Sequence, residues 1–191
     1  YFFPSKKTII GFVVNGNFNH FTRKTDNVAR VMDAQDQPVS TFQTKAGNND
    51  HVNNLFANIN FKHSFDSTGI ELTSDIDYGS FRSNSLSYNS TSYFKNDGSP
   101  LQDNYKLDGD QEGQLTLKTA KVDYVHPLKN KAKLEAGGKI SFVSSDNDAK
   151  FFDVSSGVPV NDVNKTNHFF YKENNNAAYI NFGKAYKKFD W

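Results

Sequence analysis

Hydrophobic and polar side chains alternate along much of this chain, most clearly in the stretch 115–142. Two alternating runs there flank a turn at 126–131 that is rich in Pro, Lys and Asn. The second run places five apolar or small residues on one face: Leu134, Ala136, Gly138, Ile140 and Phe142. The residues between them are charged, serine or glycine, and a period of two is typical of a β-strand with one apolar face and one wet face.

The same alternation predicts strands in four further segments: 8–20, 53–63, 70–81 and 170–184. A tight turn at 65–69, supplied with Asp, Ser and Gly, joins two of them directly. Three stretches rich in polar residues and strand breakers are predicted to be long loops: 22–50, 82–111 and 144–168. A strand extension at 28–32 is an alternative within the first loop. The prediction is therefore an all-β chain of about six long antiparallel strands in up-and-down meander order.

Composition narrows the function classes. The 191 residues carry 22 basic and 21 acidic side chains, a formal net charge of +1, which gives no electrostatic case for nucleic-acid binding. Cysteine is absent, so disulfides and thiolate metal sites are excluded. Aromatic residues reach 15% although the mean hydropathy is −0.70, a pairing that suits two-faced strands with polar connections. No apolar run approaches the roughly 20 residues of a transmembrane helix.

Three features favour an outer-membrane β-barrel over a soluble sandwich. Strands of about ten residues, tilted by ~45°, span roughly the 25 Å apolar thickness of an outer membrane. Short turns at one end and long loops at the other are typical of such barrels, whereas a Greek-key sandwich mixes the two. Aromatic residues, which suit the headgroup level of a membrane, gather near the predicted turns: Tyr1, Phe2, Phe3, Phe65, Tyr124, Tyr186, Phe189 and Trp191.

Six strands are too few to close a barrel, for which eight is the practical minimum. We therefore expect residues 1–191 to form one all-β segment of a larger barrel, with the remaining strands outside this chain. Its two open edges should pair with neighbouring strands or with another copy. The alternative from another class is a soluble, secreted all-β binding module of the adhesin or carbohydrate-binding type.

Several short motifs in the second half of the chain resemble a known family. They are Asp123-Tyr124 followed by Pro127, then the run Leu134-Glu135-Ala136-Gly137, then Phe169, Tyr171 and Glu173, and finally Ala177-Ala178-Tyr179. This pattern resembles the outer-membrane barrels of TonB-dependent receptors from Bacteroidetes. The resemblance covers nearly the whole chain and is best after residue 115.

The resemblance implies a C-terminal receptor barrel in the outer membrane, whose plug domain and TonB-contacting segment lie upstream. It also implies reception or uptake of a nutrient. The implied partners are outer-membrane lipid, a TonB-type energy-coupling protein and a nutrient ligand that the sequence does not identify.

The sequence predicts no catalytic, cofactor or metal site, and no enzyme activity. The five histidines lack ligand spacing. The acidic pair Asp146 and Asp148 lacks the glycine and distal glutamate of a calcium loop, so a solvated loop is expected. Glu71, Asp75 and Asp77 share a face, where a solvated lumen-facing row is favoured over paired carboxylates for glycoside cleavage.

Exposed aromatic residues among Ser, Asn and Gly make an adaptable binding surface. Six such residues in the predicted long loops are therefore the candidates for ligand contact: Tyr88, Tyr93, Phe94, Tyr105, Phe151 and Phe152. The alternative is that these side chains pack the loops against one another.

Overall fold

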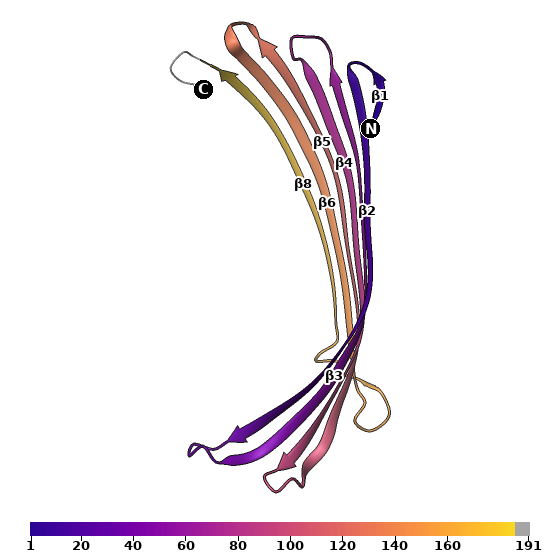
Figure 1. The fold of residues 1–191 in the computed structure, drawn as a ribbon, viewed down its shortest axis with the longest axis vertical. Helices are drawn as coiled ribbons and strands as arrows, with labels where there is room; N and C mark the ends of the chain where they lie inside the picture. The colour runs from indigo at the N-terminus through magenta and orange to yellow at the C-terminus, as the bar shows by residue number, and fades with distance from the viewer. Residues whose placement is uncertain (186–191) are drawn as a thin grey trace.

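The computed structural model describes residues 1–185 as a single curved β-sheet (Figure 1). Six strands are long: β2 (Thr8–Met32), β3 (Pro38–Ser64), β4 (Glu71–Lys95), β5 (Pro100–Leu128), β6 (Ala132–Asp153) and β8 (Asn167–Lys184). Three elements are short: β1 (Phe2–Ser5), the 3₁₀ turn η1 (Lys129–Lys131) and β7 (Val160–Asn161). The all-β prediction is confirmed. No helix in the described part of the chain is long and apolar enough to cross a membrane.

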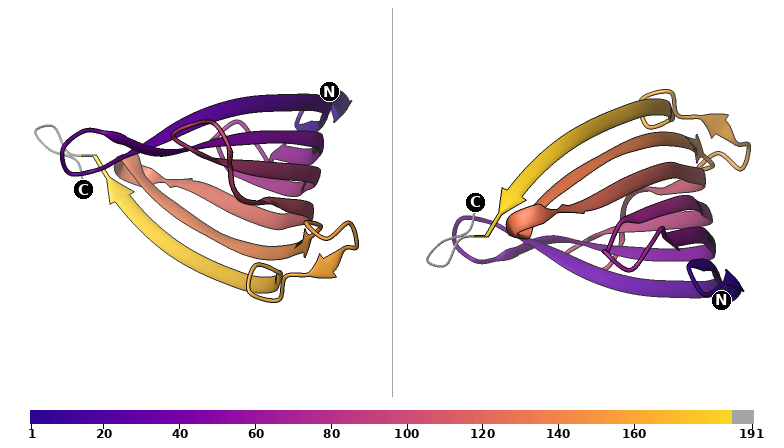
Figure 2. Two further views of the ribbon diagram at one scale, coloured as in Figure 1. Left: turned by 90° about the horizontal axis from the view of Figure 1, so that it is seen from below. Right: turned by 90° about the horizontal axis from the view of Figure 1, so that it is seen from above.

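Each long strand pairs antiparallel with the next one along the chain, from β2 to β6 and then β8. The meander order is therefore confirmed. Viewed from either end, the sheet curls into an open arc (Figure 2). It is a single layer, and Ala132 is the one hydrophobic residue that is buried among residues 1–185. The described chain has no second sheet, so it lacks the interior that a soluble sandwich requires.

The three predicted long loops are mostly strand, and that prediction was wrong. β2 and β4 run for 25 residues each and β5 for 29, so they extend straight through 22–50 and 82–111. The extension at 28–32 belongs to β2. Asn, Ser and Asp have low strand propensity, but here every strand is paired along its length, and pairing outweighs propensity. The region 144–168 keeps a loop only beyond Asp153.

Short turns therefore occur at both ends of the sheet. The predicted asymmetry in loop length is replaced by strands that continue far beyond the apolar alternation (Figure 1). Aspartate side chains organise these distal turns. The Asp97 carboxylate accepts hydrogen bonds from the Ser99 amide at 2.9 Å and the Ser99 hydroxyl at 2.6 Å, while Gly98 takes a φ of +83°.

The expected aromatic cluster near the short turns is confirmed in part. The rings of His63, Phe65, Tyr124 and His126 contact one another in sequence, with centroids 4.8 to 6.3 Å apart. The other members of the predicted set that lie after residue 185, Tyr186, Phe189 and Trp191, are outside the described residues.

Candidate functional site: two faces of one sheet

One face of the sheet carries a broad apolar surface next to the short turns, interrupted by Ser74 of β4 and by Lys118 of β5. The register brings Phe12 opposite Ile59, and Ile59 opposite Ile76. We call this surface the apolar band, and its residues are Ile10, Phe12, Val14, Phe18, Leu55, Ala57, Ile59, Phe61, Leu72, Ile76, Tyr78, Ala120, Val122, Tyr124, Leu134, Ala136, Ile140, Phe142, Ala178, Ile180 and Phe182. Nothing in the described chain covers it: Ile180 is 80% exposed and Phe18 is 75% exposed.

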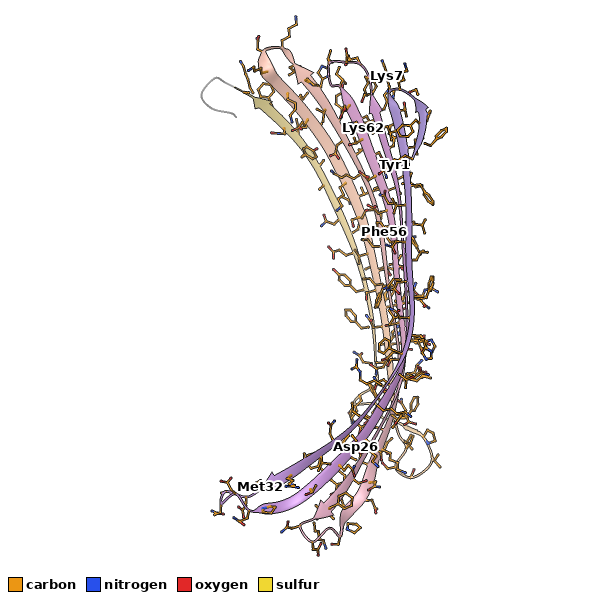
Figure 3. The ribbon with its side chains drawn as sticks, viewed as in Figure 1. Tyr1, Lys7, Asp26, Met32, Phe56 and Lys62 are labelled. Atoms are coloured by element: carbon orange, nitrogen blue, oxygen red, sulfur yellow. The ribbon has the colours of Figure 1, made fainter. Side chains whose placement is uncertain are left out.

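The opposite face carries ion pairs in β3 to β6 at the same level. Three lysines there pair with carboxylates: Lys62 with Glu71 at 2.9 Å, Lys121 with Asp123 at 2.6 Å, and Lys133 with Glu135 at 2.7 Å. These carboxylates are the less exposed partners, with 15% exposure for the Asp123 side chain. Side chains converge on the concave side of a curved sheet, so we assign the ionic face to the concave side. Figure 3 shows side chains projecting from both faces of this one layer.

The edge of the apolar band that lies away from the short turns runs obliquely across the strands; we call it the upper edge, and it faces the bottom of the view in Figure 1. It lies at Phe18 in β2, but Leu55 of β3 pairs with Gly16, two residues lower. Ala178, the last band residue in β8, lies in register with Ile10 of β2, so the edge has moved eight residues from Phe18 across five strand pairs. The lower edge, from Ile10 to Phe182, moves four residues in the same direction.

This slope measures the tilt of the strands against a flat boundary. A mean shift of ~1.2 residues per strand is ~4 Å along strands that are ~4.8 Å apart, which corresponds to a tilt of about 40°. Strands of outer-membrane barrels tilt by roughly 35–45°. The nine-residue interval 10–18 covers about 30 Å along β2, hence roughly 23 Å perpendicular to that boundary. The apolar band therefore has the height and slope of a lipid-facing surface.

Above the upper edge the two faces exchange character. The convex face becomes polar, with His20, Arg82 and Asp146. The concave face becomes apolar over a group of residues that we call the inner apolar belt: Phe21, Val52, Phe81, Leu115, Leu117, Val143, Phe169 and Tyr171. Phe81 pairs with Leu115, and Leu117 pairs with Val143. The wall therefore has a wet outside and an apolar inside beyond the membrane level.

A tyrosine on the concave face ties three strands together. Tyr179 of β8 donates a hydrogen bond to Asp123 of β5 at 2.8 Å, reaching across Gly137 of β6. A Cβ at Gly137 would lie 2.5 Å from both the Asp123 carboxylate and the Tyr179 ring. The three residues belong to three separate motifs in the sequence, and the structure shows that they form one contact.

The predicted ligand-contact residues lie on strands rather than on loops, which corrects their predicted placement. Tyr93, Tyr105 and Phe151 belong to the concave face, and Tyr105 accepts a hydrogen bond from Lys165 at 3.2 Å. The remaining three, Tyr88, Phe94 and Phe152, belong to the other face. The six residues therefore do not form one surface.

The inner apolar belt was missed by sequence reasoning, although a signal for it exists. In β5 the apolar residues have even numbers at Ala120 and Val122 but odd numbers at Leu115 and Leu117. This change of phase marks the exchange of faces. The predicted acidic and histidine residues do not gather into a metal centre: residues 1–185 contain no cluster of three or more potential metal-binding side chains. His168 instead pairs with Asp146 at 2.6 Å.

A single-layer antiparallel wall with an oblique apolar band and an ionic concave face defines a segment of an outer-membrane β-barrel. Comparison with known families agrees with this class. Residues 63–191 match the model of the outer membrane protein beta-barrel family, and the chain belongs to that family. No curated protein matches the chain at a significant level. Membership places the protein in the outer membrane, in contact with its lipid, and suggests a structural or transport role.

Proposed function

We propose that this chain forms part of the barrel of a TonB-dependent receptor, which receives a nutrient outside the cell and takes it up across the outer membrane. The motif resemblance around Asp123, Gly137 and Tyr179 supports the narrower family. The proposal includes an upstream plug domain and a TonB-type energy-coupling protein as partners.

The observation that carries this proposal is the change in chemistry along the concave face. A barrel whose only role is to anchor something in the membrane does not need an apolar interior above the lipid. Here Phe81 and Leu115 are 42% and 43% exposed on the concave face, directly above the ionic lumen. An apolar surface at the mouth of an ionic lumen suits the capture of a ligand before its passage inward.

Three of the predicted ligand-contact residues lie on this same face farther out. Tyr93 packs against Phe42 of the neighbouring strand, with ring centroids 6.4 Å apart. We propose that Tyr93, Tyr105 and Phe151 belong with the inner apolar belt to the ligand path. Tyr88, Phe94 and Phe152, on the other face, remain predicted ligand contacts through the outside of the projecting hairpins.

The first experiment tests uptake in the bacterium that carries the gene. Wild-type cells, a strain lacking this gene and a strain lacking the TonB-type protein are grown on a panel of single nutrients. We expect at least one nutrient on which both deletion strains lose growth. The proposal fails if the gene deletion grows like the wild type on every nutrient that requires the TonB-type protein.

The second experiment tests the concave face with the nutrient found in this way. Phe81→Ser in the full-length protein should reduce its uptake about tenfold, because an interface aromatic typically contributes more than 1 kcal/mol. Asn84→Ser is the matched control, since Asn84 lies on the same strand but on the convex face. Equal uptake by both variants would remove the inner apolar belt from the ligand path.

A further inference from the structure

A row of basic side chains follows the upper edge of the apolar band on the convex face. β2, β3, β4, β5 and β8 contribute one residue each: His20, His51, Arg82, Lys118 and Lys172. We call these five residues the basic row. His20 and Lys118 occupy the next convex-face position after the last apolar residue of their strands, Phe18 and Ala120. The other three lie four to six residues beyond the last apolar residue of their strands, so the row slants with the apolar band and follows its edge.

The basic row is not neutralised by the described chain. Arg82 and Lys118 make no ion pair or side-chain hydrogen bond within residues 1–185. Lys172 contacts only a ring, with its Nζ 4.9 Å from the centroid of Phe170. The concave face shows the opposite arrangement, because Lys62, Lys121 and Lys133 there each have a carboxylate partner.

Acidic residues also occur on the convex face at the height of the row, where Asp146 lies in register with Arg82. Asp146 pairs with His168, and Asp148 pairs with Lys150 at 2.7 Å. Glu112 receives a hydrogen bond from Asn84 at 3.5 Å. Two of these three carboxylates thus have their own basic partners, and the positive charge of Arg82 and Lys118 is left for an external anion.

The position of the row identifies the kind of anion. It borders the lipid-facing surface directly, so the groups at this height are lipid headgroups. The strands extend far beyond the apolar band only on the side of the row, and long extensions mark the extracellular side of a barrel, so the row meets the outer leaflet. The outer leaflet of an outer membrane is built of phosphorylated glycolipid. A guanidinium and an ammonium are the side-chain groups that bind phosphate oxygens best.

The surface around Arg82 also suits the sugar part of such a lipid. An open groove of about 470 Å³ on this part of the sheet is lined by Arg82, by the amides of Asn53, Asn84 and Gln114, and by the carboxylates of Glu112, Asp146 and Asp148, which accept hydrogen bonds from hydroxyl groups. Amide groups both donate to and accept from hydroxyl groups. We propose that the basic row, with this groove, binds the phosphorylated sugar headgroup of an outer-leaflet glycolipid and so fixes the height of the barrel in the membrane.

The test uses the full-length protein folded into bilayer discs that contain either bisphosphorylated lipid A or its dephosphorylated form in phosphatidylcholine. Native mass spectrometry counts the lipid A molecules that remain bound to the released protein. We expect the wild type to retain the phosphorylated form preferentially. Each basic residue near an anionic surface contributes about 1 kcal/mol, so Arg82→Gln with Lys118→Gln should lower retention roughly tenfold to thirtyfold.

The control double variant is Lys106→Gln with Lys139→Gln, which removes the same charge elsewhere. Lys106 lies on the same strand and face as Lys118 but farther from the apolar band, and Lys139 lies on the concave face. This control should retain lipid A like the wild type. Circular dichroism confirms folding of each variant, and release of lipid A by raised salt tests the wild type independently.

Three results would overturn the proposal. The first is equal retention of phosphorylated and dephosphorylated lipid A by the wild type. The second is an equal loss of lipid in the two double variants, which would show that net charge rather than the basic row is responsible. The third is displacement of the lipid by inorganic phosphate at millimolar concentration, which would assign the site to free phosphate.

Discussion

Val14 and Asn15 are neighbours in β2 that face opposite sides of the sheet, and they offer a direct test of which side meets lipid. Val14 lies at the centre of the apolar band on its strand and is 53% exposed. Asn15 belongs to the concave face, opposite Phe56. Val14→Arg would place a guanidinium in the middle of the hydrocarbon layer, whereas Asn15→Arg would place the same group in the aqueous lumen.

An arginine at the midplane of a barrel's lipid face costs about 2–4 kcal/mol. With a urea m-value of about 2 kcal/mol per molar, Val14→Arg should lower the unfolding midpoint by roughly 1–2 M. Asn15→Arg should change it by less than about 0.5 kcal/mol, as is usual for a solvated position. The assay is urea unfolding of the full-length protein in lipid vesicles, followed by tryptophan fluorescence. An equal cost for the two variants would refute the assignment of the faces.

Three further predictions follow from the concave face, a distal turn and the sheet edges. Gly137→Ala should push Tyr179 off its carboxylate partner and cost about 1.5 kcal/mol in unfolding free energy, whereas Gly138→Ala, whose Cβ meets only an ordinary contact, should cost less. Hydrogen bonds from Ser99 lower the pKa of Asp97. The stabilisation of this turn should therefore be complete above about pH 4 and be lost as the pH falls through the lowered pKa, which hydrogen exchange would measure. Expressed alone, the chain should associate through its unpaired β2 and β8 edges, as ultracentrifugation in detergent would show.

Each of these three predictions has a clear contrary result. Equal costs for the two glycine variants would mean that the tyrosine contact contributes nothing to stability. Exchange in the 96–99 turn that does not rise on acidification, or that rises equally after Asp97→Asn, would remove the carboxylate from the turn. A monodisperse monomer of the isolated chain would show that its edges need no partner.

The fold class could be predicted because one period of two persists across several strands. The run from Leu134 to Phe142 is sufficient to predict a strand with one apolar face. Strand length could not be predicted in the same way. In 82–111 the polar residues follow no alternation of hydrophobicity, and whether such a segment forms a strand depends on the neighbouring strands that pair with it.

The placement of the candidate ligand-contact residues was predicted less well, for a related reason. Tyr88 and Tyr93 look alike in the sequence, but they differ by an odd number of residues and so lie on opposite faces of β4. Grouping aromatic residues by composition therefore merged two surfaces. The inner apolar belt needs the register of all six strands to be seen as one surface. Family membership confirms the outer-membrane barrel, while the receptor function remains our proposal.

The most direct test of the account is a cysteine scan along β5, from Gln114 to Tyr124, in a chain that has no native cysteine. Each full-length single-cysteine variant is labelled with a fluorophore, folded into vesicles and quenched by either brominated lipid or aqueous iodide. Lipid should quench positions 120, 122 and 124, while iodide should quench the odd positions between them. At 114 and 116 lipid quenching should disappear. Lipid quenching at Leu115 and Leu117 instead, or at no position, would contradict the assignment of the apolar band to the membrane.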